Sequence, residues 1–133
     1  MSQPLPDGYV DPLDAAQVIP VLESALSMVG IDGLVELLAR IPGTRRDPGR
    51  PGGFLKTPVR PSIWLGAEHN LTLTEPVQHQ HVVGGVILSR DPVGRGALAP
   101  LVAQLIGPVL RESGGEREAS IALTAAREAF GAM

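Results

Sequence analysis

The chain has 133 residues, a length typical of one domain that can bury a core without disulfides or metal ions. Apolar residues make up 44% of the sequence but aromatic residues only 3%, so the core must be built from Leu, Val, Ile and Ala. The net charge of −3 argues against a nucleic-acid-binding protein, and the absence of cysteine excludes disulfides and thiolate chemistry.

The first residues carry neither a basic region nor an apolar run of the kind found in signal peptides. No apolar run approaches the ~18 residues that a membrane-spanning helix needs, so we expect a cytoplasmic protein without a membrane partner. All basic residues except Lys56 are arginine, a usage typical of a high-GC bacterium. We expect a flexible N-terminal arm over residues 1–10 and a single domain over residues 11–133.

The first helix is expected to begin at Asp11-Pro12, because Asp is favoured at an N-cap and Pro at the first helical position. Helical spacing of apolar residues continues to Met28 or Val29. Pro20 interrupts this pattern. Either the helix kinks at Pro20, or a short turn over residues 12–18 precedes a helix that begins near Ile19.

A second helix is expected after Gly30, with Asp32 near its start and Pro42-Gly43 after its end. Together the two helices predict a helical hairpin that packs on a sheet.

Residues 44–53 contain no apolar residue other than Pro and Gly, which predicts an exposed, mobile loop. Arg45 and Arg46 give this loop positive charge, so they are candidate ligand-binding residues for an anion. The simpler interpretation, which we favour, is a solvated linker.

Residues 63–90 predict two or three antiparallel strands. Leu71 to Thr74 alternates apolar and polar residues, as a strand with one wet face does. Glu75-Pro76 then interrupts the run, since proline cannot donate to a ladder. Val82 to Leu88 is almost continuously apolar, which predicts a strand covered on both faces at its inner end.

Trp64 is the single tryptophan and lies in the first of these strands. It is a candidate for the wall of a ligand site, because Trp is enriched at binding surfaces. Trp is more often simply part of the core, and that interpretation stays open.

All three histidines, His69, His79 and His81, lie in the strand region. His79 and His81 share a face because side chains alternate along a strand. An odd number of residues in the intervening loop puts His69 on the same face, and an even number puts it on the opposite face. Three imidazoles on one face, with Glu68 or Glu75 nearby, could hold a divalent metal ion. The alternative is a polar strand end that meets solvent.

Arg95 lies between two glycines before the next helix, where free backbone N–H groups could hold an anion. The alternative is a tight chain reversal. The helix that follows has the most regular apolar spacing in the chain and ends at Ser113-Gly114, with a kink expected at Gly107-Pro108. A last helix is expected over residues 116–130.

These elements predict an α+β fold in which a small antiparallel sheet of two to four strands carries the N-terminal helical hairpin and two C-terminal helices. No catalytic or cofactor motif is present, and we expect no cofactor. The sequence favours a non-catalytic homodimer that recognises a partner protein or a small apolar ligand, with no nucleic acid bound. The alternative is a small enzyme or metal-binding protein that uses the histidine hairpin.

Overall fold

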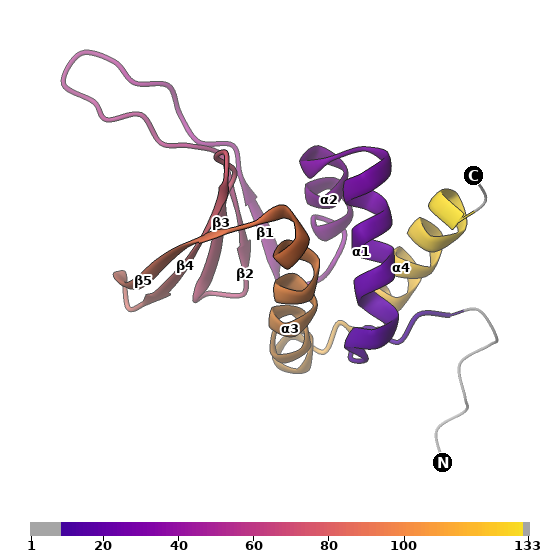
Figure 1. The fold of residues 1–133 in the computed structure, drawn as a ribbon. Helices are drawn as coiled ribbons and strands as arrows, with labels where there is room; N and C mark the ends of the chain where they lie inside the picture. The colour runs from indigo at the N-terminus through magenta and orange to yellow at the C-terminus, as the bar shows by residue number, and fades with distance from the viewer. Residues whose placement is uncertain (1–8, 132–133) are drawn as a thin grey trace.

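The computed structural model describes residues 9–131, which form four helices and a sheet (Figure 1). The helices lie at the two ends of the described chain and the strands lie between them. In chain order the elements are α1 (Ala15–Met28), α2 (Ile31–Leu38), β1 (Thr44–Asp47), β2 (Ser62–Leu65), β3 (His69–Thr72), β4 (Val77–Val83), β5 (Val86–Val93), α3 (Arg95–Ser113) and α4 (Glu116–Gly131).

The sheet has five strands in the order β1-β2-β3-β4-β5, and every neighbouring pair is antiparallel. The α+β class is as predicted, but the prediction of two to four strands is wrong. One cause is the run from Val82 to Leu88, which is a hairpin and not one strand. Gly84 and Gly85 both have positive φ, of 58° and 82°, as the two central residues of a type I′ hairpin turn require.

The second cause is β1, which lies inside the segment predicted as a loop. Its residues carry no aliphatic side chain, so no apolar pattern announces a strand. Backbone pairing with β2 forms it, with Thr44 opposite Leu65 and Asp47 opposite Ser62. β1 is therefore an edge strand that is stabilised by its backbone pairing with β2.

The helices follow the sequence signals closely, although two of them contain prolines. α1 begins after Asp14, whose carboxylate accepts a hydrogen bond from the N–H of Ala16 at 3.0 Å, and it continues through Pro20. The expected start at Asp11 is thus three residues early. α3 continues through Pro108 to Ser113, and Gly114 ends it in the left-handed conformation.

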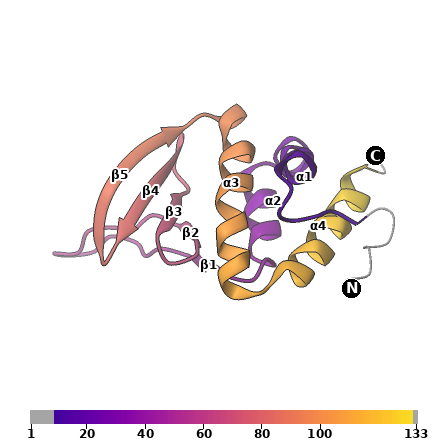
Figure 2. The same ribbon diagram turned by 90° about the horizontal axis from the view of Figure 1, so that it is seen from below.

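All four helices lie on one side of the sheet (Figures 1 and 2). α3 lies next to the sheet, and α1 and α4 lie beyond it. The sequence predicted that every helix packs on the sheet, whereas in the structure the helices form a bundle that stacks on α3. Ile63, Leu65 and Leu71 are fully or almost fully buried on the inner face of the sheet, which is the face turned toward the helices. A single core therefore joins sheet and bundle.

The corner of the sheet at β1 and β2 contacts α3 closely. Gly43 has a φ of 88°, and a Cβ built on it would lie 2.5 Å from Cγ1 of Val109. The N–H of Gly66 donates to the carbonyl oxygen of Gly43 at 2.8 Å. Glycine at position 43 thus satisfies both a backbone conformation and a close approach.

Val10 is fully buried, and both of its backbone polar groups are paired: its N–H donates to Oγ1 of Thr124 and its carbonyl oxygen accepts from Oγ of Ser120. Tyr9 is 41% exposed, and residues 1–8 of the predicted N-terminal arm lie outside the described residues. Within residues 9–131 no helix is both long enough and apolar enough to cross a membrane.

Between β1 and β2 the chain extends far from the body of the molecule (Figure 1). We call residues 48–61 the arm, which is a different segment from the N-terminal arm predicted over residues 1–10. Backbone bridges join Arg50 to Val59 and Gly53 to Lys56, so the arm is a two-stranded ribbon. Phe54 and Leu55 at its tip are 93% and 92% exposed. The mobility expected for residues 44–53 stays a prediction.

Candidate functional site

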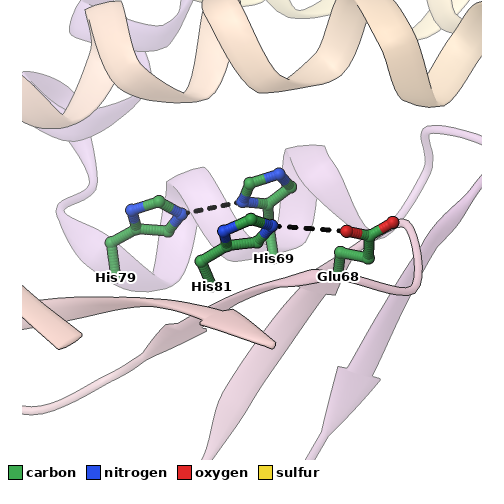
Figure 3. Close-up of polar contacts among 4 residues, drawn as sticks. All are labelled: Glu68, His69, His79 and His81. Atoms are coloured by element: carbon green, nitrogen blue, oxygen red, sulfur yellow. Dashed lines mark hydrogen bonds and ion pairs between the residues drawn. The ribbon is translucent and has the colours of Figure 1, made fainter. Parts of the chain in front are cut away.

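The strand register assigns the histidines to the inner face of the sheet. Thr72 pairs with Gln78, so residues 73–77, an odd number, separate this pair. His69 lies opposite His81, and Leu71 lies opposite His79. All three imidazoles therefore rise from β3 and β4 on the same face as the buried Leu71, on the side where the helices lie (Figure 3).

The ring of His69 contacts the rings of both His79 and His81 (Figure 3). Nδ1 of His69 and Nε2 of His79 are 2.9 Å apart, a hydrogen bond in which one ring donates and the other accepts. The rings of His69 and His81 are stacked, with centroids 4.8 Å apart. Nε2 of His81 lies 3.3 Å from Oε1 of Glu68. We call His69, His79, His81 and Glu68 the histidine cluster.

Partial burial disfavours a charge on two of the rings. It lowers the pKa of His69 below the ordinary value of 6.5, and the nearby His79 and His81 lower it further, against the opposing effect of Glu68. Burial also lowers the pKa of His79, although the carboxylate of Asp91 opposes the effect. Lowered pKa values favour the neutral form of both rings, and the hydrogen bond between them needs an unprotonated nitrogen on the ring that accepts.

The arrangement of the cluster differs from that of a metal centre. Among residues 9–131, no group of three or more His, Cys, Asp or Glu side chains could hold a metal ion. One nitrogen of His79 and one of His69 point at each other, and His81 turns toward Glu68 (Figure 3). Metal binding by the three histidines stays a prediction, and binding would require the rings to reorient.

The outer face of the sheet, which is turned away from the helices, holds two of the predicted ligand-binding residues. Arg45 pairs with Trp64 across β1 and β2, and the guanidinium carbon of Arg45 lies 5.7 Å from the centroid of the Trp64 ring. Trp64 is only partly buried, so it is not a core residue. It lines an open depression of about 550 Å³ in the outer face.

The other two predicted ligand-binding residues lie elsewhere. Arg46 is on the inner face of β1, where Nη1 lies 3.8 Å from Oε1 of Glu36 in an exposed ion pair. Nη2 of Arg95 donates to the carbonyl oxygen of Leu26 at 2.7 Å, near the end of α1. Arg95 therefore bonds to a backbone group that the helix end leaves unpaired. The structure brings together Arg45 and Trp64 and separates them from Arg46 and Arg95.

Sequence reasoning missed three residues that share the face of Trp64. Asn70, Gln80 and Arg90 lie on β3, β4 and β5, and all three line the depression. They are ordinary polar residues in local sequence, and only the pairing of the strands shows that they are neighbours. The outer face is consequently polar, whereas the sequence suggested an apolar ligand.

The fold and the two faces define a class: an α+β protein in which helices cover one face of a five-stranded antiparallel sheet and leave the other open. The sequence model of a family described as a domain of unknown function, DUF5073, matches residues 10–131, and the chain belongs to this family. No curated protein and no solved structure matches the chain.

Proposed function

We propose that this chain is a non-catalytic accessory protein of the cytoplasm that binds protein partners and forms a homodimer through its β4–β5 hairpin. The observation that carries the proposal is the exposure of apolar side chains at the tip of that hairpin. Four aliphatic residues are 42% to 60% exposed there: Val83, Val86, Ile87 and Leu88. We call these four residues the hairpin patch.

An exposed cluster of aliphatic side chains favours burial against another surface. Val83 is the last residue of β4, and the other three residues of the hairpin patch lie on β5. Within residues 9–131, β5 is the last strand of the sheet, and its outer backbone groups have no neighbouring strand. An edge strand of this kind is a template for pairing with another chain. Arg90, Asp91 and Pro92 discourage such pairing along the second half of β5, so contact is favoured at the patch.

A second copy of the chain is the occupant that we propose. In a two-fold dimer the same patch lies on both sides of the interface, so an apolar patch is complementary to itself. The hairpin patch is at the end of a projecting hairpin, a shape that suits another protein surface better than a small apolar ligand, which needs an enclosing cavity.

The test is sedimentation of the wild type and of two matched variants. Ile87→Glu adds a charge to the patch, and Ile121→Glu adds the same charge to α4 at a residue that is 54% exposed. We expect a dimer for the wild type and for Ile121→Glu, and a monomer for Ile87→Glu. A monomeric wild type at micromolar concentrations, or equal behaviour of the two variants, would refute the proposal.

The second candidate is a metal-binding protein that uses the histidine cluster. The convergence of three imidazoles supports it, and the bonding of the rings to one another and to Glu68 weighs against it. If it is correct, zinc raises the melting temperature at pH 7.5 and raises it much less at pH 5.5, because ligation needs neutral imidazole. His81→Ala then abolishes the effect. No change with zinc at either pH would leave the cluster with a structural role.

A further inference from the structure

The outer face of the sheet carries a row of polar side chains that crosses all five strands. The register places each member opposite the next, and the row consists of Arg45, Trp64, Asn70, Gln80 and Arg90. Neighbouring strands are about 4.8 Å apart, so the row extends for about 19 Å along the sheet. We call it the polar row.

The centre of the polar row is held in place by hydrogen bonds. Nδ2 of Asn70 donates to Oγ of Ser62 at 3.0 Å, and Oγ1 of Thr72 donates to Oδ1 of Asn70 at 2.9 Å. Asn70 is 5% exposed and Ser62 is 6% exposed. The floor of the depression is therefore a fixed polar network that requires no reordering when a ligand binds.

The remaining side chains of the depression are available to a ligand. Within residues 9–131, no hydrogen bond or ion pair of the chain engages the side chains of Gln78, Gln80 or Arg90. Pro58 and Arg60, from the base of the arm, form one wall. The depression thus offers two free amides and two arginines beside one tryptophan, and also the carboxylate of Asp47, which accepts a hydrogen bond from the N–H of Gly49 at 2.9 Å.

We propose that the polar row binds an acidic oligosaccharide. A sugar ring has a flat face of C–H groups that packs on an aromatic ring, and its neighbouring hydroxyl groups suit the paired donor and acceptor of an amide. Arg45 lies over the Trp64 ring and does not line the depression. The ring therefore presents a different side to the depression. The arginine forks of Arg90, at one end of the row, and of Arg60, in the wall of the depression, suit the carboxylates of uronic acids.

The composition of the face favours a sugar over single-stranded nucleic acid. Proteins that bind single strands stack successive bases on several aromatic side chains, whereas Trp64 is the single aromatic residue that lines the depression. A single aromatic ring suits one sugar unit, and the two arginines of the depression suit the carboxylates beside it.

Trp64 is the only tryptophan of the chain, so its fluorescence reports directly on the site. The experiment titrates the full chain with tetragalacturonic acid, with the neutral maltotetraose and with a short oligothymidylate, followed by fluorescence and calorimetry. We expect the acidic tetrasaccharide to bind and to change the Trp64 emission. The neutral one should bind about tenfold more weakly, because it lacks the carboxylates that pair with arginine.

Variants locate the binding. Gln80→Ala and Arg90→Ala should each weaken binding about tenfold, since each removes a hydrogen-bond donor to the ligand. Gln104→Ala, at an exposed position of α3, is the matched control and should change nothing. The site does not depend on the dimer, so Ile87→Glu should bind the tetrasaccharide as the wild type does.

Three results would overturn the proposal. Absence of heat and of any emission change with both sugars would remove the site. Equal binding of the two sugars would remove the role of the arginines. Tighter binding of the oligothymidylate would assign the face to nucleic acid.

Discussion

The inner face of the sheet and the β4–β5 hairpin carry the same kinds of aliphatic side chain, but only the first is covered. Ile63 and Leu65 are fully buried beneath the helices, whereas Ile87 is 48% exposed and Leu88 is 60% exposed. The two regions differ in what lies over them, because the helices leave the end of the hairpin uncovered. An apolar run in the sequence therefore predicts a surface that favours burial. The surface that covers it can belong to the same chain or to another copy of the chain.

The largest expected effect is the loss of a covered side chain. Leu65→Ala should lower the free energy of unfolding by about 2–5 kcal/mol, because it leaves a cavity in the core. Ile87→Ala, measured at a protein concentration low enough for the monomer, should change it by less than about 0.5 kcal/mol. Urea denaturation measures both. Equal losses would mean that the hairpin is part of the core and would erase the contrast.

Two glycines test the same contrast between the covered part of the sheet and the exposed hairpin. Gly43 and Gly84 both have positive φ, so alanine adds about 1–2 kcal/mol of backbone strain at either position. At Gly43 the added Cβ also meets Val109, whereas at Gly84 it meets no atom within 4 Å. We expect Gly43→Ala to lower the denaturation midpoint further than Gly84→Ala. The reverse order would contradict the close contact between the corner of the sheet and α3.

The histidine cluster lies at the boundary of the two regions and should make stability depend on pH. The pKa values of His69 and His79 are lowered in the folded chain. As pH falls below 6.5, these two rings therefore bind protons in the unfolded chain before they do so in the folded chain. This contribution to stability is therefore complete above pH 6.5 and is lost as pH falls through the folded pKa values.

The measurement is the difference in unfolding free energy between variant and wild type from pH 8 to pH 5, with His79→Gln as the variant and Gln78→Ala as its control. The wild type should lose more stability than His79→Gln over this range, while Gln78→Ala follows the wild type. Parallel curves for all three proteins would show that the ring of His79 does not carry the effect.

The smallest effect concerns the arm, and it changes cleavage and not stability. Trypsin should cut first after Lys56, which is exposed at the arm tip, because Arg50 and Arg60 each precede a proline that blocks the enzyme. Arg45 and Arg46 should be protected by their ladder in β1. Mass spectrometry identifies the fragments, and Lys56→Gln should survive longer. First cleavage at Arg45 or Arg46 would mean that β1 frays before the arm is cut.

The helices could be predicted from local chemistry, whereas the sheet could be predicted only in part. Spacing and end signals predicted α4 and the end of α3 almost to the residue, because helix contacts join residues that are near in sequence. Arg95, expected before α3, is its first residue. β1 escaped prediction because its stability comes from pairing with β2. Gly84-Gly85 was overlooked inside an apolar run, although a pair of glycines flanked by valines is a recognised signal for a hairpin.

The sites could be predicted only in part, for the same reason. Trp64 and the histidines were identified as unusual residues, and the parity rule stated the condition under which three imidazoles share a face. Asn70, Gln80 and Arg90 have no local signature, because their significance comes from a register that spans three hairpins. The polar row is a property of the sheet and not of any one segment.

The central claim is that a second copy of the chain covers the hairpin patch, which the helices leave exposed. Hydrogen exchange of β5 tests this claim most directly. The account predicts that amides of Val86 to Arg90 exchange more slowly in a concentrated wild-type solution than after dilution. In Ile87→Glu they should exchange fast at both concentrations. Exchange of the wild-type amides at one rate, independent of concentration and equal to that of the variant, would contradict the account.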